Sequence, residues 1–477
     1  MKFFRYQLAS WALAISLAIS LSAAAQTQTQ TKTDSSAPQS APCPAGVPAA
    51  TRCLTGQDNA GAYYWIAVPA VWNQVLVMHA HGGPELGEPT AKRSADDLTR
   101  WAITVKAGYA WAGSTFRQGG VEVRAAGEDT ERLRQIFVAH VAKPRLTLLH
   151  GQSWGAGVAA KLAESLVENV AVNVAKDEAK KDAEKTSRSS SGESPYDGVL
   201  LTSGVLGGGT RSYEFRLDLR VVYQALCNNH PLPSEPQYPL WQGLPPGSKL
   251  TRAELAQRVN DCTGLNLEVT KRSAEQQRTL SSLLSVVRIP ERSLMGHLNW
   301  GTWHFADVVF KRLNGGNPWG NVGAVYKGSD DDAALNAKVA RYRADPAAVA
   351  RFAADTDLIG RIKLPVLSAH AIDDPVAFVE LQSAFFETQQ RAGNTKNLLQ
   401  VFTSESEHSY WSDPEYPALL AALQAWIDSG VKPSAQGISE ACRQLVSTYA
   451  GGCHFDVNYE APPLASRVAQ RERITTP

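Results

Sequence analysis

Residues 146–157 read LTLLHGQSWGAG, and this stretch decides the fold. The apolar run 146–149 predicts a short buried strand, and the small residues from Ala156 onward predict a helix. Between them lies a Gly-x-Ser-x-Gly turn centred on Ser153. Its two glycines allow a sharp bend that projects the serine hydroxyl from the sheet. The pattern predicts a nucleophilic serine; a serine in an ordinary strand-to-helix connection is the alternative.

A nucleophilic serine needs a base and an acid, and hydrolases with this turn supply them later in the chain in the order Ser, Asp/Glu, His. The strand predicted at 398–403 leads to His408, on a loop before a helix expected near 414–429. His408 is therefore the candidate base. The alternative is a solvated loop histidine without a catalytic role.

Backbone amides suited to a negatively charged oxygen are predicted at two places. The apolar strand 74–81 ends in His-Gly-Gly, where Gly82 and Gly83 let the backbone approach a substrate. The amide of Trp154, at the positive end of the helix that follows the turn, would supply the other half of an oxyanion hole. Three nearby histidines are interpreted as structural: His79, His81 and His150.

Together these segments resemble the α/β-hydrolases, in the branch close to esterases and prolyl-oligopeptidase-like enzymes. Residues 108–117 (GYAWAGSTFR) are similar to the Gly-Tyr-strand-Arg segment after the oxyanion loop of that branch, and 130–138 to the helix before the serine. The similarity covers roughly residues 60–170, 195–210 and 360–430. It implies a serine hydrolase that works through a Ser–His–Asp triad.

Two adjacent aspartates after the strand predicted at 364–371 compete for the role of triad acid. Asp374 stands four residues after His370, which matches the H-G-x-x-D spacing common in these enzymes, with Ala371 in place of the glycine. Asp373 fits the Asp-Asp-x-Val pattern of some peptidases of this fold. We favour Asp374.

The rest of the chain alternates strands and helices, which predicts an α/β fold with a mainly parallel sheet covered by helices on both faces. Functional loops then gather at the carboxyl ends of the strands. The expected strands lie near 62–69, 74–81, 109–115, 146–151, 197–203, 364–371 and 398–403.

Two insertions interrupt this alternation. Residues 176–193 are charged and serine-rich, typical of a solvated loop or frayed helix. The larger insertion, 207–360, is expected to be a helical cap, with helical patterns at 252–259, 275–287 and 333–354. The expected divisions are a signal peptide (1–25), a disordered leader (26–42), the hydrolase core (43–206 and 361–432) separated by the cap, and a C-terminal extension (433–477).

An aromatic stretch of the cap, 296–305 (GHLNWGTWHF), is a candidate wall of the substrate pocket. Such pockets are mostly apolar with few polar groups. The residues proposed for this wall are Trp300, Trp303 and His304. The alternative interpretation places them in the core of the cap.

The N-terminus predicts export. Two basic residues precede the apolar run 11–19, and small residues at 23–25 suit cleavage before Gln26. The run is short for a membrane span, so a periplasmic or extracellular protein without stable membrane insertion is expected. In that compartment six cysteines form disulfides, and local spacing favours three pairs: Cys43–Cys53, Cys227–Cys262 and Cys442–Cys453.

Composition excludes some partners. The chain has 47 basic and 46 acidic residues among 477, a net charge of +1, so no basic surplus favours nucleic acid. No cysteine spacing suggests zinc, and the chemistry implied by the triad needs no cofactor or metal. The expected substrate is a small-molecule or oligomeric ester, and the sequence leaves the oligomeric state open.

Three functions follow in order of preference. The first is an ester hydrolase that forms an acyl-enzyme on Ser153. The second is a serine peptidase or amidase of the prolyl-oligopeptidase-like branch, although about 60 residues before the first strand of the core cannot form the propeller usual in those enzymes. The third is a non-catalytic binding protein on a hydrolase scaffold.

Overall fold

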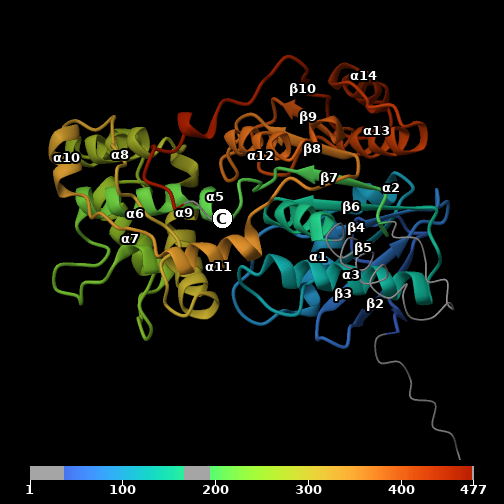
Figure 1. Ribbon diagram of the computed structural model, residues 1–477, viewed down its shortest axis with the longest axis horizontal. Helices are drawn as coiled ribbons and strands as arrows, with labels where there is room; N and C mark the ends of the chain where they lie inside the picture. Colours follow the sequence, from blue (N-terminus) through green and yellow to red (C-terminus); the bar gives the residue numbers. More distant parts are fainter. Residues whose placement is uncertain (1–36, 166–193, 475–477) are drawn as a thin grey trace, which may run out of the picture. The chain divides into compact units, whose positions relative to one another are not determined.

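The computed structural model describes residues 37–165 and 194–474. In this part of the chain, ten strands form one sheet in the order β1-β2-β3-β5-β4-β6-β7-β8-β9-β10 (Figure 1). The predicted signal peptide, most of the predicted leader and the charged insertion at 176–193 lie outside the described residues. The strands are Gln39–Ser40 (β1), Arg52–Gln57 (β2), Tyr63–Val68 (β3), Val75–Ala80 (β4), Ala110–Ser114 (β5), Leu146–Gln152 (β6), Gly198–Thr202 (β7), Val366–Ala371 (β8), Leu398–Thr403 (β9) and Phe455–Asp456 (β10).

The centre of the sheet is parallel. Strands β5, β4, β6, β7, β8 and β9 run in one direction, and β3 lies antiparallel to both β2 and β5. The crossover that places β5 between β3 and β4, followed by β6 to β9 in sequence order, is the strand order of the α/β-hydrolase fold. All seven predicted strands are present. The sequence did not predict β1, β2 and β10, which are short or, like RCLTGQ in β2, lack a regular apolar alternation.

Helices cover both faces of the sheet. One apolar core lies between the sheet and helices Ala91–Arg100 (α1), Ala102–Lys106 (α2) and Glu415–Ser429 (α13). A second core lies on the opposite face, beneath Val123–His140 (α3), the helical residues 154–165 and Glu380–Arg391 (α12). The predicted covering of both faces is confirmed, and it explains why β4, β6, β7 and β8 are buried along their whole length.

Helices around a separate apolar core fill the segment between β7 and β8, which corresponds to the predicted cap. Residues of α12 and of the C-terminal segment also contribute to this core. The cap helices gather as a group coloured green to orange in Figure 1. The helices are Gly209–Ser212 (α5), Glu214–Cys227 (α6), Arg252–Thr263 (α7), Ala274–Val287 (α8), Leu294–Asn299 (α9), Asp332–Lys338 (α10) and Pro346–Thr356 (α11). Between α9 and α10, residues Trp300–His304 and Asp307–Arg312 have π-helical winding.

The helix predicted at 333–354 is wrong in one respect, because the structure divides it into α10 and α11. Pro346 has no amide hydrogen to continue a helix and its ring excludes the preceding turn, so it occupies the start of α11 instead. The side chain of Asp345 caps that start by accepting a hydrogen bond from the amide of Ala347 (2.9 Å).

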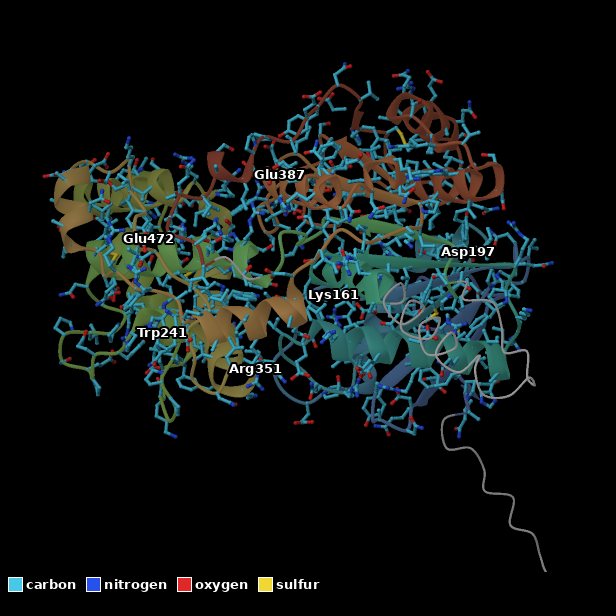
Figure 2. The ribbon with its side chains drawn as sticks, in the orientation of Figure 1. Lys161, Asp197, Trp241, Arg351, Glu387 and Glu472 are labelled. Carbon is cyan, nitrogen blue, oxygen red and sulfur yellow. A yellow bond between two sulfur atoms is a disulfide. The ribbon has the colours of Figure 1, made fainter. Side chains whose placement is uncertain are left out.

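The C-terminal residues return to the cap. After Ala435–Leu445 (α14) and β10, the chain coloured red in Figure 1 runs toward the cap helices. Arg471 is buried there between Glu214 (3.0 Å) and Asp218 (2.5 Å) of α6. Glu472, labelled in Figure 2, pairs with Arg343 (2.5 Å). These contacts join the end of the described chain to the cap.

Disulfides link neighbouring segments of the described chain. They join Cys43 to Cys53, Cys227 to Cys262 and Cys442 to Cys453, the pairs that the sequence spacing favours. Within the described ranges, none of the helices is both long enough and apolar enough to cross a membrane.

Candidate active site

The turn after β6 holds Ser153 in a left-handed conformation with φ of +57°. Non-glycine residues avoid this region, so the surrounding backbone must enforce it. A Cβ atom on Gly155 would overlap the carbonyl oxygens of Ala80 and His81, and one on Gly151 would overlap the backbone of Gly155. The two glycines therefore let the turn pack tightly against the end of β4. This is the sharp bend predicted from the sequence.

The structure brings Ser153, His408 and Asp374 together, although they are far apart in the sequence. Nε2 of His408 lies 2.8 Å from Oγ of Ser153. Nδ1 of the same ring lies 2.7 Å from Oδ2 and 3.0 Å from Oδ1 of Asp374. In the tautomer that fits these contacts, Nδ1–H donates to the carboxylate and Nε2 accepts from the serine hydroxyl.

The two candidate acids occupy different environments. Asp374 is 4% exposed, and its Oδ1 also accepts hydrogen bonds from the amides of Val376 (2.8 Å) and Ala377 (2.9 Å). These amides fix the carboxylate in the direction of His408. The side chain of Asp373 is exposed and makes no such contact with the imidazole in the described structure.

Free backbone amides lie next to Ser153. In the described part of the chain, the amides of Gly82, Gly83 and Trp154 donate no hydrogen bond to a protein acceptor. Gly83 has φ of +65°, and a Cβ atom on Gly82 would overlap the side chain of Gln152. Trp154 is the first residue of the helix 154–165, where amides lack intrahelical acceptors.

Gln152 and Ser409 are two site residues that the sequence analysis missed. Nε2 of Gln152 donates to Oγ of Ser409 (2.7 Å) and lies 3.5 Å from Nε2 of His408. Ser409, like Ser153, has a left-handed backbone, with φ of +62°. Their only signal in the sequence is that each neighbours a predicted triad residue, so their contact could not have been inferred without the fold.

Among the described residues, side chains of the cap contact the loops of the candidate site. Nε2 of His304 lies 2.8 Å from the carbonyl oxygen of Pro84, on the loop that carries Gly82 and Gly83. Nε2 of His297 lies 3.0 Å from the carbonyl oxygen of Pro375, next to the candidate acid. Arg292 donates to the carbonyl oxygens of Asp373 (3.2 Å) and Ser406 (2.7 Å). It thereby joins the loop that carries Asp374 to the loop that carries His408.

The predicted pocket aromatics take two different positions. The π-helical winding aligns Trp300 with His304, and their rings stack with centroids 4.9 Å apart. His304 in turn reaches the loop that carries Gly82 and Gly83, so this pair lies beside the candidate site. Trp303 packs instead under the exposed Arg252, at 4.8 Å.

The other histidines near the site are buried and hydrogen-bonded. Nδ1 of His150 lies 3.1 Å from Nδ1 of His79, and Nε2 lies 3.1 Å from Oγ1 of Thr202. Burial lowers the pKa of His150 to about 3 and holds the pKa of His79 well below its usual value. His370 lies between Gln382 and the carbonyl oxygen of Ala377. Across residues 37–165 and 194–474, no group of three His, Cys, Asp or Glu side chains could hold a metal ion.

Comparisons with known proteins give likenesses of fold. No protein-family profile and no curated protein sequence matches the chain. Feruloyl esterase B from Aspergillus oryzae is similar at 12% identity over 83% of this chain and 87% of that one, with a TM-score of 0.42. The rice cell wall degrading esterase LipA from Xanthomonas oryzae is similar at 13% identity over 75% and 83%, with a TM-score of 0.32. Because both scores lie below 0.5, the fold is assigned by the strand order and by the turn at Ser153. By that order the chain has the α/β-hydrolase fold.

Proposed function

We propose that this protein hydrolyses carboxylic esters with Ser153 as nucleophile, His408 as base and Asp374 as the acid that orients the base. The observation that carries the proposal is the unbroken series of contacts from Ser153 Oγ through His408 to Asp374, at 2.8 and 2.7 Å. The strained backbone of Ser153 supports the same role, because strain of this kind is stored where a side chain must be aimed.

The chemistry follows in two halves. Oγ of Ser153 forms a bond to the ester carbonyl carbon while His408 takes the hydroxyl proton, and the amides of Gly82, Gly83 and Trp154 stabilise the resulting oxyanion. The bond to the alcohol oxygen then breaks, and His408 gives its proton to that oxygen. Water attacks the acyl-serine in the second half, His408 takes a proton from it, and Ser153 regains its proton as the acid leaves.

The proposal also includes the role of the cap, the cellular compartment and the substrate. The cap at 207–360 would cover the serine, with Trp300 and His304 beside the oxyanion loop. A periplasmic or extracellular location is supported by the disulfides, which persist in oxidising compartments. The expected partner is a small-molecule or oligomeric ester.

A substrate panel separates ester hydrolysis from peptidase or amidase activity. Purified protein is assayed with 4-nitrophenyl esters of increasing acyl length and with aminoacyl 4-nitroanilides, each with the Ser153→Ala variant as the control. The proposal expects Ser153-dependent turnover of esters and much slower turnover of anilides. Faster turnover of the anilides would indicate that the same triad serves a peptidase or amidase. If neither class showed Ser153-dependent turnover, the proposal would be contradicted.

A further inference from the structure

The buried cation Arg216 of α6 lacks an anionic partner. Arg216 is 5% exposed. Its guanidinium lies over the rings of Phe215 (4.5 Å), Trp300 (4.6 Å) and Tyr213 (5.3 Å). Within the described chain, the guanidinium forms no ion pair and no hydrogen bond, and its Nε atom is buried without a partner. The aromatic residues hold the cation without neutralising it.

Two other buried arginines, one in the cap and one that packs against it, are neutralised. Arg471 contacts two carboxylates, and Arg272 contacts the carboxylate of Glu291 at 2.5 Å. Two acids whose charges act on Tyr213 accept hydrogen bonds elsewhere: Asp355 from the amides of residues 123 and 124, and Asp357 from Thr210. Arg216 therefore has no counter-charge. Arg220, one turn further along α6, is also buried without an ion pair, but it donates a hydrogen bond to the carbonyl oxygen of Gly301 (2.9 Å), whereas the guanidinium of Arg216 donates none within the described residues.

This arrangement is costly for the folded protein. Removing a charged group from water costs more free energy than cation–π contacts return. Burial lowers the pKa of Arg216 to about 10, so the guanidinium still carries its charge at neutral pH. A cost of this kind is retained where a buried charge serves binding rather than stability.

The neighbours of Arg216 place it at the cap side of the active site. Trp300 stacks on His304, which contacts the oxyanion loop at Pro84. Phe215 packs edge-on against His297, which contacts the acid loop at Pro375. Through these contacts, Trp300 is linked to the loop at Pro84 and Phe215 to the loop at Pro375. Burial lowers the pKa of His297, and the charges of Arg216 and His408 both add to this effect, as expected if both lie near it.

We propose that Arg216 binds a free carboxylate on the substrate, so that the esters hydrolysed here carry a second, unesterified carboxyl group. This inference rests on the proposed ester hydrolysis and specifies its substrate class. A guanidinium matches a carboxylate with two parallel hydrogen bonds, and the aromatic residues around it exclude water from the pair.

The test compares matched esters that differ only in this carboxylate. Mono-(4-nitrophenyl) adipate and its methyl ester place the charge on the acyl side, and 4-acetoxybenzoate and its methyl ester place it on the alcohol side. For at least one pair, the wild type should prefer the carboxylate form in kcat/KM. Arg216→Met should reduce that preference roughly 10- to 100-fold, mainly through KM, and Arg216→Lys should reduce it less.

Two controls separate binding from folding and from net charge. Arg278→Gln removes a positive charge from an exposed position of the cap and should leave the preference unchanged. Arg216→Met should melt no lower than the wild type, because it removes an unpaired buried charge. If Arg216→Met leaves the preference for the carboxylate form unchanged, the inference is overturned. Equal losses on both members of each pair, with a lower melting temperature, overturn it as well.

A binding measurement keeps the inference separate from catalysis. Calorimetry with monomethyl adipate should detect binding to the Ser153→Ala protein and lose it when Arg216→Met is added. If neither the neutral nor the carboxylate-bearing esters are hydrolysed but this binding pattern holds, the proposed function fails and the carboxylate site stands. If neutral esters are hydrolysed and the monoester binds both proteins equally, the carboxylate site fails and the proposed function stands.

Discussion

Oδ2 of Asp374 lies 2.7 Å from Nδ1 of His408, and Oδ1 of the same carboxylate accepts two backbone amides of its own loop. The carboxylate is thus fixed from one side and aimed at the imidazole from the other. Asp373, one residue earlier, is exposed. Adjacent residues of a turn point in different directions, and here only the second reaches the histidine.

This geometry predicts a large difference between two adjacent substitutions. Asp374→Asn should lower kcat for a 4-nitrophenyl ester roughly 100- to 10,000-fold, because the imidazole would lose its tautomer control and its counter-charge. Asp373→Asn, the matched control, should change kcat little. The reverse ranking in steady-state kinetics would assign the acid to Asp373.

The close packing of Gly155 against the end of β4 predicts a second contrast. A Cβ atom at position 155 would collide with the carbonyl oxygens of Ala80 and His81 and displace the oxyanion loop. At Gly157, two residues further along the helix, the nearest atom to such a Cβ would be the carbonyl oxygen of Val205 at 3.4 Å. Gly155→Ala should lose most turnover and melt several degrees lower, whereas Gly157→Ala should remain close to the wild type. Equal behaviour of the two variants in activity and thermal melting would argue against the importance of this contact.

Glu415, at the start of α13, predicts a dependence of stability on pH. Burial raises the pKa of this carboxyl to about 7, from an ordinary value of 4.5. Between these values the folded protein binds a proton that the unfolded chain has released, so the contribution of Glu415 to stability falls as pH rises from 4.5 to 7.

Glu415→Gln removes this decrease in stability, because glutamine does not titrate. The variant should gain on the order of 1–3 kcal/mol of unfolding free energy relative to the wild type between pH 4 and pH 8, with the gain levelling above pH 7. Urea unfolding at a series of pH values measures this difference. A constant difference across the series would mean that Glu415 does not titrate in this range.

The disulfides predict unequal contributions to stability. Cys227–Cys262 closes 35 residues and Cys43–Cys53 closes 10, so the longer loop restricts the unfolded chain more. The double variant Cys227→Ser/Cys262→Ser should lose about 1 kcal/mol more than Cys43→Ser/Cys53→Ser in the chain-entropy account. Non-reducing peptide mapping of the wild type should recover both pairs, and free thiols in exported protein would contradict them.

The sequence predicted the elements that depend on local pattern. The strand, turn and helix around Ser153 are encoded by adjacent residues, so the bend could be anticipated. The preference for Asp374 over Asp373 came from a spacing, whereas the amides that aim Asp374 became visible only in the structure. The helix expected at 333–354 failed because its apolar pattern hid the stop imposed by Pro346.

Contacts between distant segments that no known motif specifies could not be predicted. Arg216 meets Trp300 across 84 residues of the cap. Trp300 stacks on His304 within a stretch of π-helical winding that the residue types do not predict. The contact between Gln152 and Ser409 likewise requires two turns to meet. In each case the partners are set by packing of separate elements rather than by spacing along the chain.

The central claim is that Ser153 is the nucleophile, and active-site labelling tests it most directly. Wild-type protein treated with a fluorophosphonate should carry one adduct, mapped by mass spectrometry to the peptide that contains Ser153. His408→Gln should react far more slowly, and Ser153→Ala should not react while remaining folded by circular dichroism. An adduct on another serine, or undiminished labelling of the Ser153→Ala variant, would contradict the account.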